Sequence, residues 1–169
     1  RMLEKLKEEH ILFLDIETVP EEEKFDQLSA NKQKLFADKT AYQRKDEFTP
    51  EEFYERAGIW AEFGKIDCIS VGFFNPKGSE RNFRLKSFYG EEKDILTEFK
   101  HLLEDYFFKP QHLLCAHNGK EFDFPYIARR MLIHGIALPE KLNLFGKKPW
   151  EVPHLDTLEL WKFGDYKHY

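Results

Sequence analysis

An apolar run of four residues ends in two carboxylates separated by one position in the stretch Ile11-Leu12-Phe13-Leu14-Asp15-Ile16-Glu17-Thr18, near the start of the chain. An apolar run that ends at a polar turn predicts a buried strand, whose successive side chains point to opposite faces. Phe13, Asp15 and Glu17 are therefore expected on one face, and the aliphatic residues at even positions on the other. Two acids on one face repel each other and resist burial, so a divalent metal ion is the expected partner between them.

The rest of the pattern predicts strands and helices in alternation. Residues 21–58 are highly charged with scattered apolar positions, and Thr49-Pro50-Glu51-Glu52 is typical of a helix start, so this region is expected to be a helical insertion. The other expected elements are strands at 65–74 and 82–89 joined by the turn Asn75-Pro76-Lys77-Gly78, a helix at 91–107, a strand at 112–116, a helix at 122–134, a strand at 150–155 and a final helix opened by Asp156. This order predicts one α/β domain over residues 1–169, with a mixed sheet flanked by helices.

Length and charge narrow the class of protein. The chain has 169 residues, of which 41% are hydrophobic, enough for the core of a single domain. No apolar run approaches the ~20 residues of a membrane span and no signal-like segment opens the chain, so a cytoplasmic protein without a membrane partner is expected. A net charge of −5 disfavours a non-specific nucleic-acid coat but does not exclude an enzyme that acts on nucleic acid.

A second polar motif follows the expected strand at 112–116 and opens a helix: Asn118-Gly119-Lys120-Glu121-Phe122-Asp123-Phe124-Pro125-Tyr126. Loops at strand ends are where ligands meet open α/β sheets. Taken alone, Asp123 is more often a helix N-cap than a metal ligand, and Asn118 is more often a turn former. The two motifs gain meaning only when they are considered together.

Asp15-x-Glu17, followed after a later strand by Asn118-x-x-x-Phe122-Asp123-x-Pro-Tyr and Arg130, resembles the first two motifs of DEDD-type 3′–5′ exonucleases. The chain is similar to the proofreading domain of family B DNA polymerases, and more so to the stand-alone predicted exonucleases related to that domain. The resemblance implies a ribonuclease-H-like fold with a central five-stranded sheet.

The resemblance also implies a metal-dependent exonuclease that releases nucleoside 5′-monophosphates from single-stranded or frayed 3′ ends, expected to be DNA. Two Mg²⁺ or Mn²⁺ ions would clamp the attacking and leaving oxygens of the phosphodiester. Asp15 would contact both ions, Glu17 one of them, and Asp123 the second. Residues expected near the substrate are Thr18, Asn118, Phe122 and Arg130.

One departure from the family pattern concerns its third motif, which places a fourth Asp on a late helix. No residue here supplies it, since Asp156 is better explained as a helix cap and the chain ends at Tyr169. We expect the native protein to continue with this motif, as Tyr-x-x-x-Asp, and with the last helices of the fold. Residues 1–169 alone are therefore expected to be weak catalysts or inactive.

Two alternatives stay open at this point. The chain could be a non-catalytic nucleic-acid-binding module that keeps the exonuclease fold, or a phosphodiesterase for RNA or small dinucleotides.

Two histidine-based sites are weaker candidates for metal binding or catalysis. His117 could be a ligand or a base, although a role in fixing its loop is favoured, and His154 with Asp156 could form a ligand pair.

Overall fold

The computed structural model describes residues 3–75 and 80–165, and the predicted turn at 75–78 falls largely outside them. Five strands form one sheet. Their bounds are β1 Ile11–Pro20, β2 Gly64–Asn75, β3 Asn82–Tyr89, β4 Leu113–Ala116 and β5 Leu155–Asp156.

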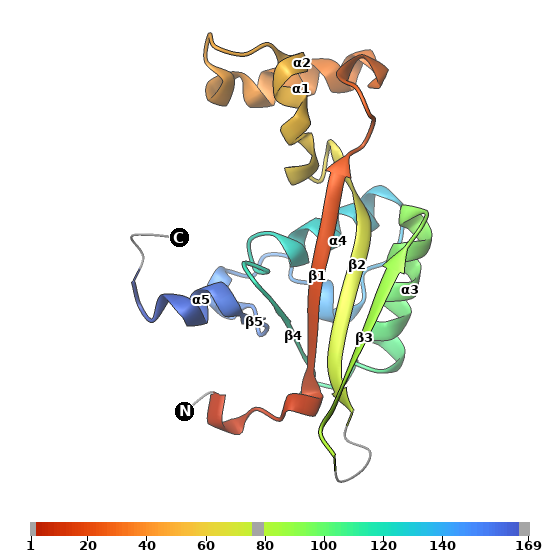
Figure 1. The fold of residues 1–169 in the computed structure, drawn as a ribbon, viewed down its shortest axis with the longest axis vertical. Coiled ribbons are helices and arrows are strands. Elements are labelled where there is room, and N and C mark those ends of the chain that lie inside the picture. Colours follow the sequence, from red (N-terminus) through yellow and green to blue (C-terminus); the bar gives the residue numbers. More distant parts are fainter. Residues whose placement is uncertain (1–2, 76–79, 166–169) are drawn as a thin grey trace.

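The strands lie in the order β3-β2-β1-β4-β5 (Figure 1). Strand β1 is antiparallel to β2 and parallel to β4, β3 is antiparallel to β2, and β5 is parallel to β4. The predicted mixed five-stranded sheet is confirmed. The last strand differs from its prediction, because Pro149–Glu151 forms a 3₁₀ turn and only Leu155–Asp156 pairs. Proline lacks the N–H that a ladder needs, which explains why the prolines at 149 and 153 lie outside the strand.

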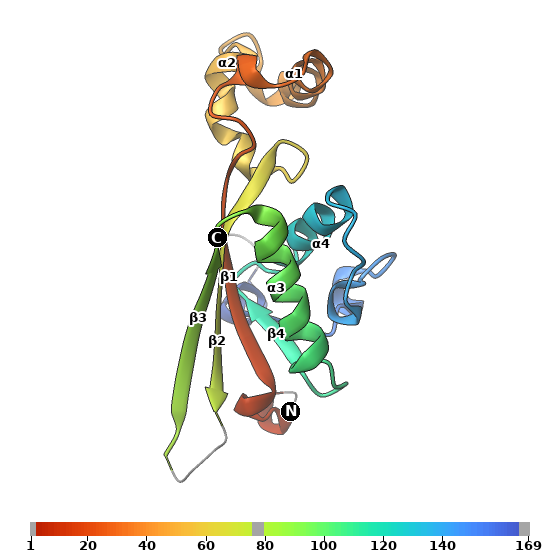
Figure 2. The ribbon, with the colours of Figure 1, turned by 90° about the vertical axis from the view of Figure 1, so that its right-hand side faces the viewer.

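Helices α3 (Glu92–Asp105) and α4 (Asp123–Ile133) cover one face of the sheet (Figure 2). The largest hydrophobic core lies between them and the sheet, and the even-numbered aliphatic residues of β1 belong to it. Asp15 and Glu17 are exposed on the opposite face. The alternation predicted from the sequence of β1 is confirmed, and it leaves the two acids on the face that these helices do not cover.

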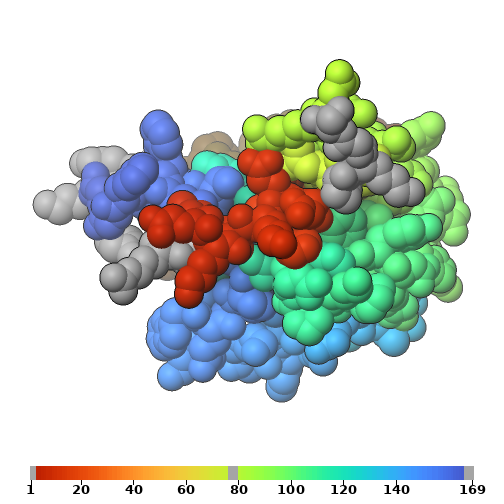
Figure 3. All heavy atoms as spheres, turned by 90° about the horizontal axis from the view of Figure 1, so that it is seen from below, coloured from red at the N-terminus to blue at the C-terminus, as the bar shows by residue number. Residues whose placement is uncertain are grey.

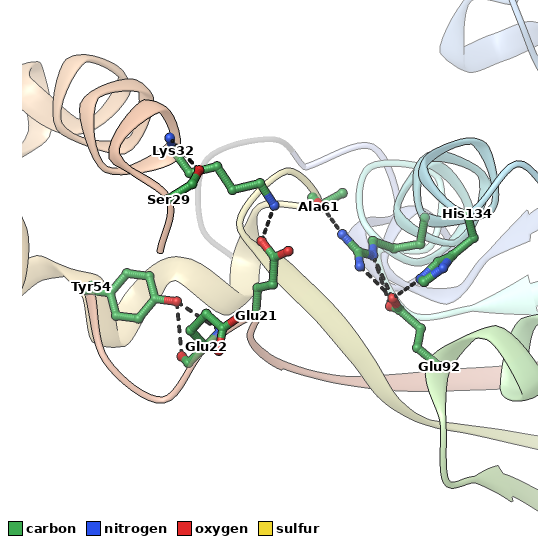
Figure 4. Close-up of polar contacts among 9 residues, drawn as sticks. Glu21, Glu22, Ser29, Lys32, Tyr54, Ala61, Glu92 and His134 are labelled. Carbon is green, nitrogen blue, oxygen red and sulfur yellow. Dashed lines mark hydrogen bonds and ion pairs between the residues drawn. The ribbon is translucent and has the colours of Figure 1, made fainter. Parts of the chain in front are cut away.

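The helical insertion after β1 is a separate layer beyond the ends of β1 and β2 (Figure 1). It contains α1 (Ala30–Arg44), α2 (Pro50–Phe53) and the 3₁₀ segment Tyr54–Ile59, and the predicted capping box joins Thr49 and Glu52. The insertion has its own aromatic core, made of Phe25, Leu28, Phe36, Phe53, Tyr54, Ala57 and Phe63. Contacts close to β1 anchor it: Lys32 pairs with Glu21, and the Tyr54 hydroxyl donates to the carbonyl of Glu22 (Figure 4).

The N-terminal turns lie below the lower end of β1, and α5 lies on the side of the sheet formed by β4 and β5 (Figure 1). Helix α5 (Thr157–Lys162) follows directly from β5. Viewed from below, the N-terminal residues lie between the β2–β3 hairpin and the segment around α5 (Figure 3). Further 3₁₀ turns are Leu3–Lys5, Glu8–His10, Phe25–Gln27 and Glu140–Leu142. Among the helices of the described residues, none combines the length and apolar character required to cross a membrane.

Candidate active site

Asp15 and Glu17 lie in the middle part of β1, and their side chains alternate with the aliphatic residues that face the core under α3 and α4. Across the sheet, Asp15 pairs in register with Ser70 and Glu17 with Cys68, and the register shifts between Glu17 and Thr18. A bulge of this kind bends a strand and redirects the side chains beyond it. The two predicted acids therefore lie on regular strand, directly before the point at which the backbone changes direction.

Asp123 is the first residue of α4 and is 3% exposed. Its Oδ2 accepts a hydrogen bond of 3.2 Å from the backbone N–H of Ile16. The N-cap of α4 is Phe122, so the N-cap role favoured for Asp123 in isolation is wrong. The carboxylate instead bonds to the strand between the two acids, which joins the two sequence motifs in space.

Burial of the Asp123 carboxylate, and second the nearby charge of Asp15, raise its pKa to about 6. Asp156 adds a smaller contribution in the same direction, while hydrogen bonds from the Ile16 and Asp123 amides oppose the shift. Like charges around a buried carboxylate disfavour its ionised form, and a bound cation reverses this effect. The electrostatics of Asp15 and Asp123 are therefore those of a site for positive charge.

Asp156 organises the loop that carries the second motif. Its carboxylate is 3% exposed and accepts hydrogen bonds from the amides of Asn118 (2.8 Å), Lys120 (3.2 Å) and Leu158 (2.9 Å). The bond to Leu158 caps α5, as predicted. The two bonds to the loop were not predicted, because their partners are 38 and 36 residues away in sequence.

Asn118 adopts a left-handed backbone conformation with φ of 56°. Asparagine tolerates this region better than most other side chains, so the turn role predicted for Asn118 from its residue type is confirmed. Phe122 is half-buried, and its ring centroid lies 5.3 Å from that of Tyr126. Phe122 immediately precedes α4, and Tyr126 lies on the first turn of that helix.

Thr18 is half-buried. A polar interaction between its side chain and the Tyr126 hydroxyl acts to lower the pKa of that hydroxyl, which donates to the carbonyl of Gly58 at 2.8 Å. Burial raises the pKa of Tyr126. Thr18 thus links β1 to α4, and a contact between its backbone and a substrate stays a prediction.

The prediction that Arg130 contacts substrate is wrong. Arg130 is 4% exposed, and its Nε and Nη2 donate to the carboxylate of Glu92, while Nη1 donates to the carbonyl of Ala61 at 2.9 Å. Glu92 also accepts from the amide of Ile66 at 2.6 Å and contacts His134. Burial alone would raise the pKa of Glu92, but the hydrogen bonds from these partners outweigh it and hold the pKa below its ordinary value. Arg130 therefore ties α4 to α3 and β2 inside the protein.

The histidine candidates have structural partners. Nδ1 of His154 accepts from the Leu114 amide at 3.1 Å, and its Nε2 lies 2.7 Å from the Lys141 carbonyl, so both ring nitrogens are used. Burial lowers the pKa of His154 to about 4, which keeps the ring neutral. His117 Nδ1 lies 3.0 Å from the Thr157 hydroxyl, consistent with the favoured role of fixing its loop. A His154–Asp156 ligand pair is excluded by these bonds.

The donor set on β1 and at the start of α4 consists of carboxylate oxygens, which are the ligands that Mg²⁺ and Mn²⁺ prefer. The chemistry of Asp15 and Asp123 fits a hard divalent cation, because a bound cation relieves the repulsion between their two carboxylates. Within residues 3–75 and 80–165, however, no three His, Cys, Asp or Glu side chains lie close enough to form a metal-binding group. Glu17 shares the face with Asp15 but does not complete such a group.

The sequence from the end of the helical insertion onward matches a known protein family. Residues 54–168 match the family model described as RNase_H superfamily. A solved structure, that of the family B DNA polymerase from the hyperthermophilic archaeon Pyrobaculum calidifontis, is similar over 76% of this chain and 11% of the polymerase chain, at 16% identity and a TM-score of 0.41. No curated protein matches the chain. The family match covers more than half of the sequence, and the chain therefore belongs to the RNase H superfamily, with a ribonuclease-H-like mixed sheet flanked by helices.

Proposed function

We propose that this protein is a nuclease, and specifically a DEDD-type 3′–5′ exonuclease that hydrolyses terminal phosphodiesters of DNA to nucleoside 5′-monophosphates. The observation that carries the proposal is the hydrogen bond from Ile16 to Asp123, because it brings the carboxylate of the second motif onto β1 between Asp15 and Glu17. Membership in the RNase H superfamily supports a nuclease-type activity.

In this proposal Asp15, Glu17 and Asp123 hold two divalent ions, Mg²⁺ or Mn²⁺. When bound, such ions lower the pKa of a water nucleophile and stabilise charge on the leaving oxygen. The role of the chain is to orient the ligands: the Ile16 amide fixes Asp123, and the β1 backbone fixes the two acids on one face. Ligands held by a rigid strand and a helix start keep their geometry better than ligands on loops.

The segment from Asn118 to Phe122 would receive the terminal nucleotide. Asp156 binds the amides of Asn118 and Lys120, and so sets the shape of this segment without needing to contact the nucleic acid. The substrate would be a single-stranded or frayed 3′ end, since a duplex end must be unpaired before one nucleotide can enter a pocket.

The test follows degradation of one oligonucleotide labelled at its 3′ end and one labelled at its 5′ end, with full-length protein and Mg²⁺ or Mn²⁺. We expect immediate release of the 3′ label and full inhibition by EDTA. Asp15→Asn combined with Glu17→Gln should abolish turnover and leave the fold intact. Glu98→Gln, an exposed change on α3, is the matched control and should retain activity. Release from the 5′ end, activity in EDTA, or an active double variant would each refute the proposal.

A second function is a nucleic-acid-binding module without catalysis. It is favoured by the finding that the described residues form no group of three metal-ligating side chains. This alternative predicts metal-independent binding and no hydrolysis by the full-length protein. Competition among DNA, RNA and small dinucleotides in the same assay would separate the DNA exonuclease from a phosphodiesterase with another substrate.

A further inference from the structure

A pocket of about 500 Å³ lies beside the candidate active site, between the loop after β4 and helix α5. Its volume is within the range of roughly 300–1,000 Å³ typical of small-molecule sites. Asn118 and Asp156, which shape the second motif, are part of its lining, and Trp150 forms another part. The pocket therefore begins at the segment that holds Asp123.

Trp150 is a largely exposed aromatic residue in the lining of this pocket. Its side chain is 76% exposed, although a tryptophan offers one of the largest apolar surfaces in proteins. The ammonium of Lys148, which does not line the pocket, lies over the face of this ring at 5.3 Å from its centroid. An aromatic ring beside a lysine is the arrangement by which proteins stack a base and meet the neighbouring phosphate of a single strand.

The charges of the pocket also suit a nucleotide. Lys120 and Lys162 line it, and Lys120 Nζ lies 2.9 Å from Glu159 Oε2. The carboxylate of Asp156 already accepts hydrogen bonds from three backbone amides. The exposed carboxylate of Glu121 is an acceptor suited to the exocyclic amino group of cytosine or adenine, whereas the lysines suit phosphates.

We infer that this pocket binds a nucleotide of a single-stranded substrate, with its base stacked on Trp150 and its phosphate near the lysines. The inference rests on the proposed nuclease function and adds a second contact for the strand beside the catalytic carboxylates. Every base has a π-face, so the stack itself accepts any sequence. The carboxylate of Glu121 favours cytosine and adenine over thymine, which lacks an exocyclic amino group.

The experiment measures fluorescence anisotropy of short labelled oligo(dC), oligo(dA) and oligo(dT) with full-length protein in EDTA, so that no hydrolysis occurs. Trp150→Ala should weaken binding about tenfold, the effect of losing one stacked base. Trp150→Phe keeps an aromatic ring and should restore most of the affinity. Trp161→Ala is the matched control, because Trp161 is 72% exposed on α5 but does not line the pocket.

Unchanged binding by Trp150→Ala, or an equal loss in Trp161→Ala, would overturn the inference. Equal binding of the three oligonucleotides would overturn the role of Glu121. Trp150 is exposed, so its replacement leaves the core intact, and a melting curve of each variant checks this. Failure of the two proposals can be told apart. Trp150-dependent binding without any turnover in Mg²⁺ refutes only the exonuclease, and metal-dependent 3′ digestion that is indifferent to Trp150 refutes only the pocket.

Discussion

Replacing Arg130 with methionine separates a structural role from a substrate-binding role at one residue. The guanidinium of Arg130 is enclosed with the carboxylate of Glu92, and the two side chains are 5% and 7% exposed. Methionine fills a similar volume but removes the charge and every donor. Glu92 would then remain in the interior as an ionised group with only part of its hydrogen bonds.

The expected loss follows from the contacts. Removing one partner of a buried ion pair costs about 3–5 kcal/mol of unfolding free energy. Glu92 keeps its bonds with the Ile66 amide and with His134. The carbonyl of Ala61 loses the donor that Arg130 supplied. The remaining partners of Glu92 offset part of the penalty, so we expect a loss near the lower end of the range, about 3 kcal/mol.

Urea unfolding of the parent, Arg130→Met, Glu92→Gln and the double variant forms a complete cycle. Glutamine retains an acceptor for Ile66, so the cycle isolates the interaction between the two side chains. We expect the double variant to be less destabilised than the sum of the single variants. Oligonucleotide affinity and its dependence on salt should stay at the parental values, because Arg130 is enclosed and contacts no phosphate.

Two results would refute this reasoning. A loss of less than about 1 kcal/mol in Arg130→Met is the size of an exposed pair and would contradict a buried ion pair. The second result is a variant that unfolds like the parent but binds oligonucleotide more weakly, with a shallower salt dependence. It would show that Arg130 contacts a phosphate of the substrate. Arg130→Lys serves as a further comparison, since it keeps the charge but loses the planar fork.

Three further predictions concern the site and its supports. Asp123→Asn should abolish turnover. In urea at pH 8 without metal, its stability should equal or exceed that of the parent, because the change removes a buried charge near Asp15. A clear loss of stability would contradict this prediction. The pKa of His154 lies at about 4 in the folded protein, below its ordinary 6.5, so the folded state binds fewer protons and stability should fall by up to about 3 kcal/mol as pH drops from about 6.5 to about 4. His154→Phe should lose this slope in urea unfolding at a series of pH values, and an unchanged slope would assign it to another group. Gly64→Ala should destabilise the fold by about 1–3 kcal/mol, because the new Cβ would lie 2.2 Å from the Tyr126 hydroxyl oxygen, and a parental melting temperature would show that this contact relaxes freely.

Local patterns predicted the sheet well because each depends on residues close together in sequence. The alternation along β1 placed Asp15 and Glu17 on the face opposite the main core, and the structure agrees. The capping box of Thr49 and Glu52 was likewise recognised from four adjacent residues. Such signals need no knowledge of the tertiary fold.

The partners of buried polar groups could not be predicted in this way. Arg130 was assigned to substrate because its motif position is basic in the related exonucleases, but its partner Glu92 lies 38 residues away on another helix. Asp123 bonds to Ile16 across 107 residues, and nothing in the sequence near Asp123 indicates this acceptor role. Both pairings depend on how α3, α4 and β1 pack against one another, which no local period encodes.

The antiparallel pairing extends to the last residue of β1 and the first residue of β2, since Pro20 is the cross-strand partner of Gly64. The insertion is therefore the loop of a β-hairpin, and this loop folds around an aromatic core of its own. Closing an unstructured loop of residues 21–63 would cost about 2 kcal/mol more than closing a four-residue turn, since the cost grows with the logarithm of length. A loop that is folded internally has fewer freely moving residues between its ends. The insertion can thus be large without a proportionate increase in the free energy needed to pair β2 with β1, the strand that carries Asp15 and Glu17.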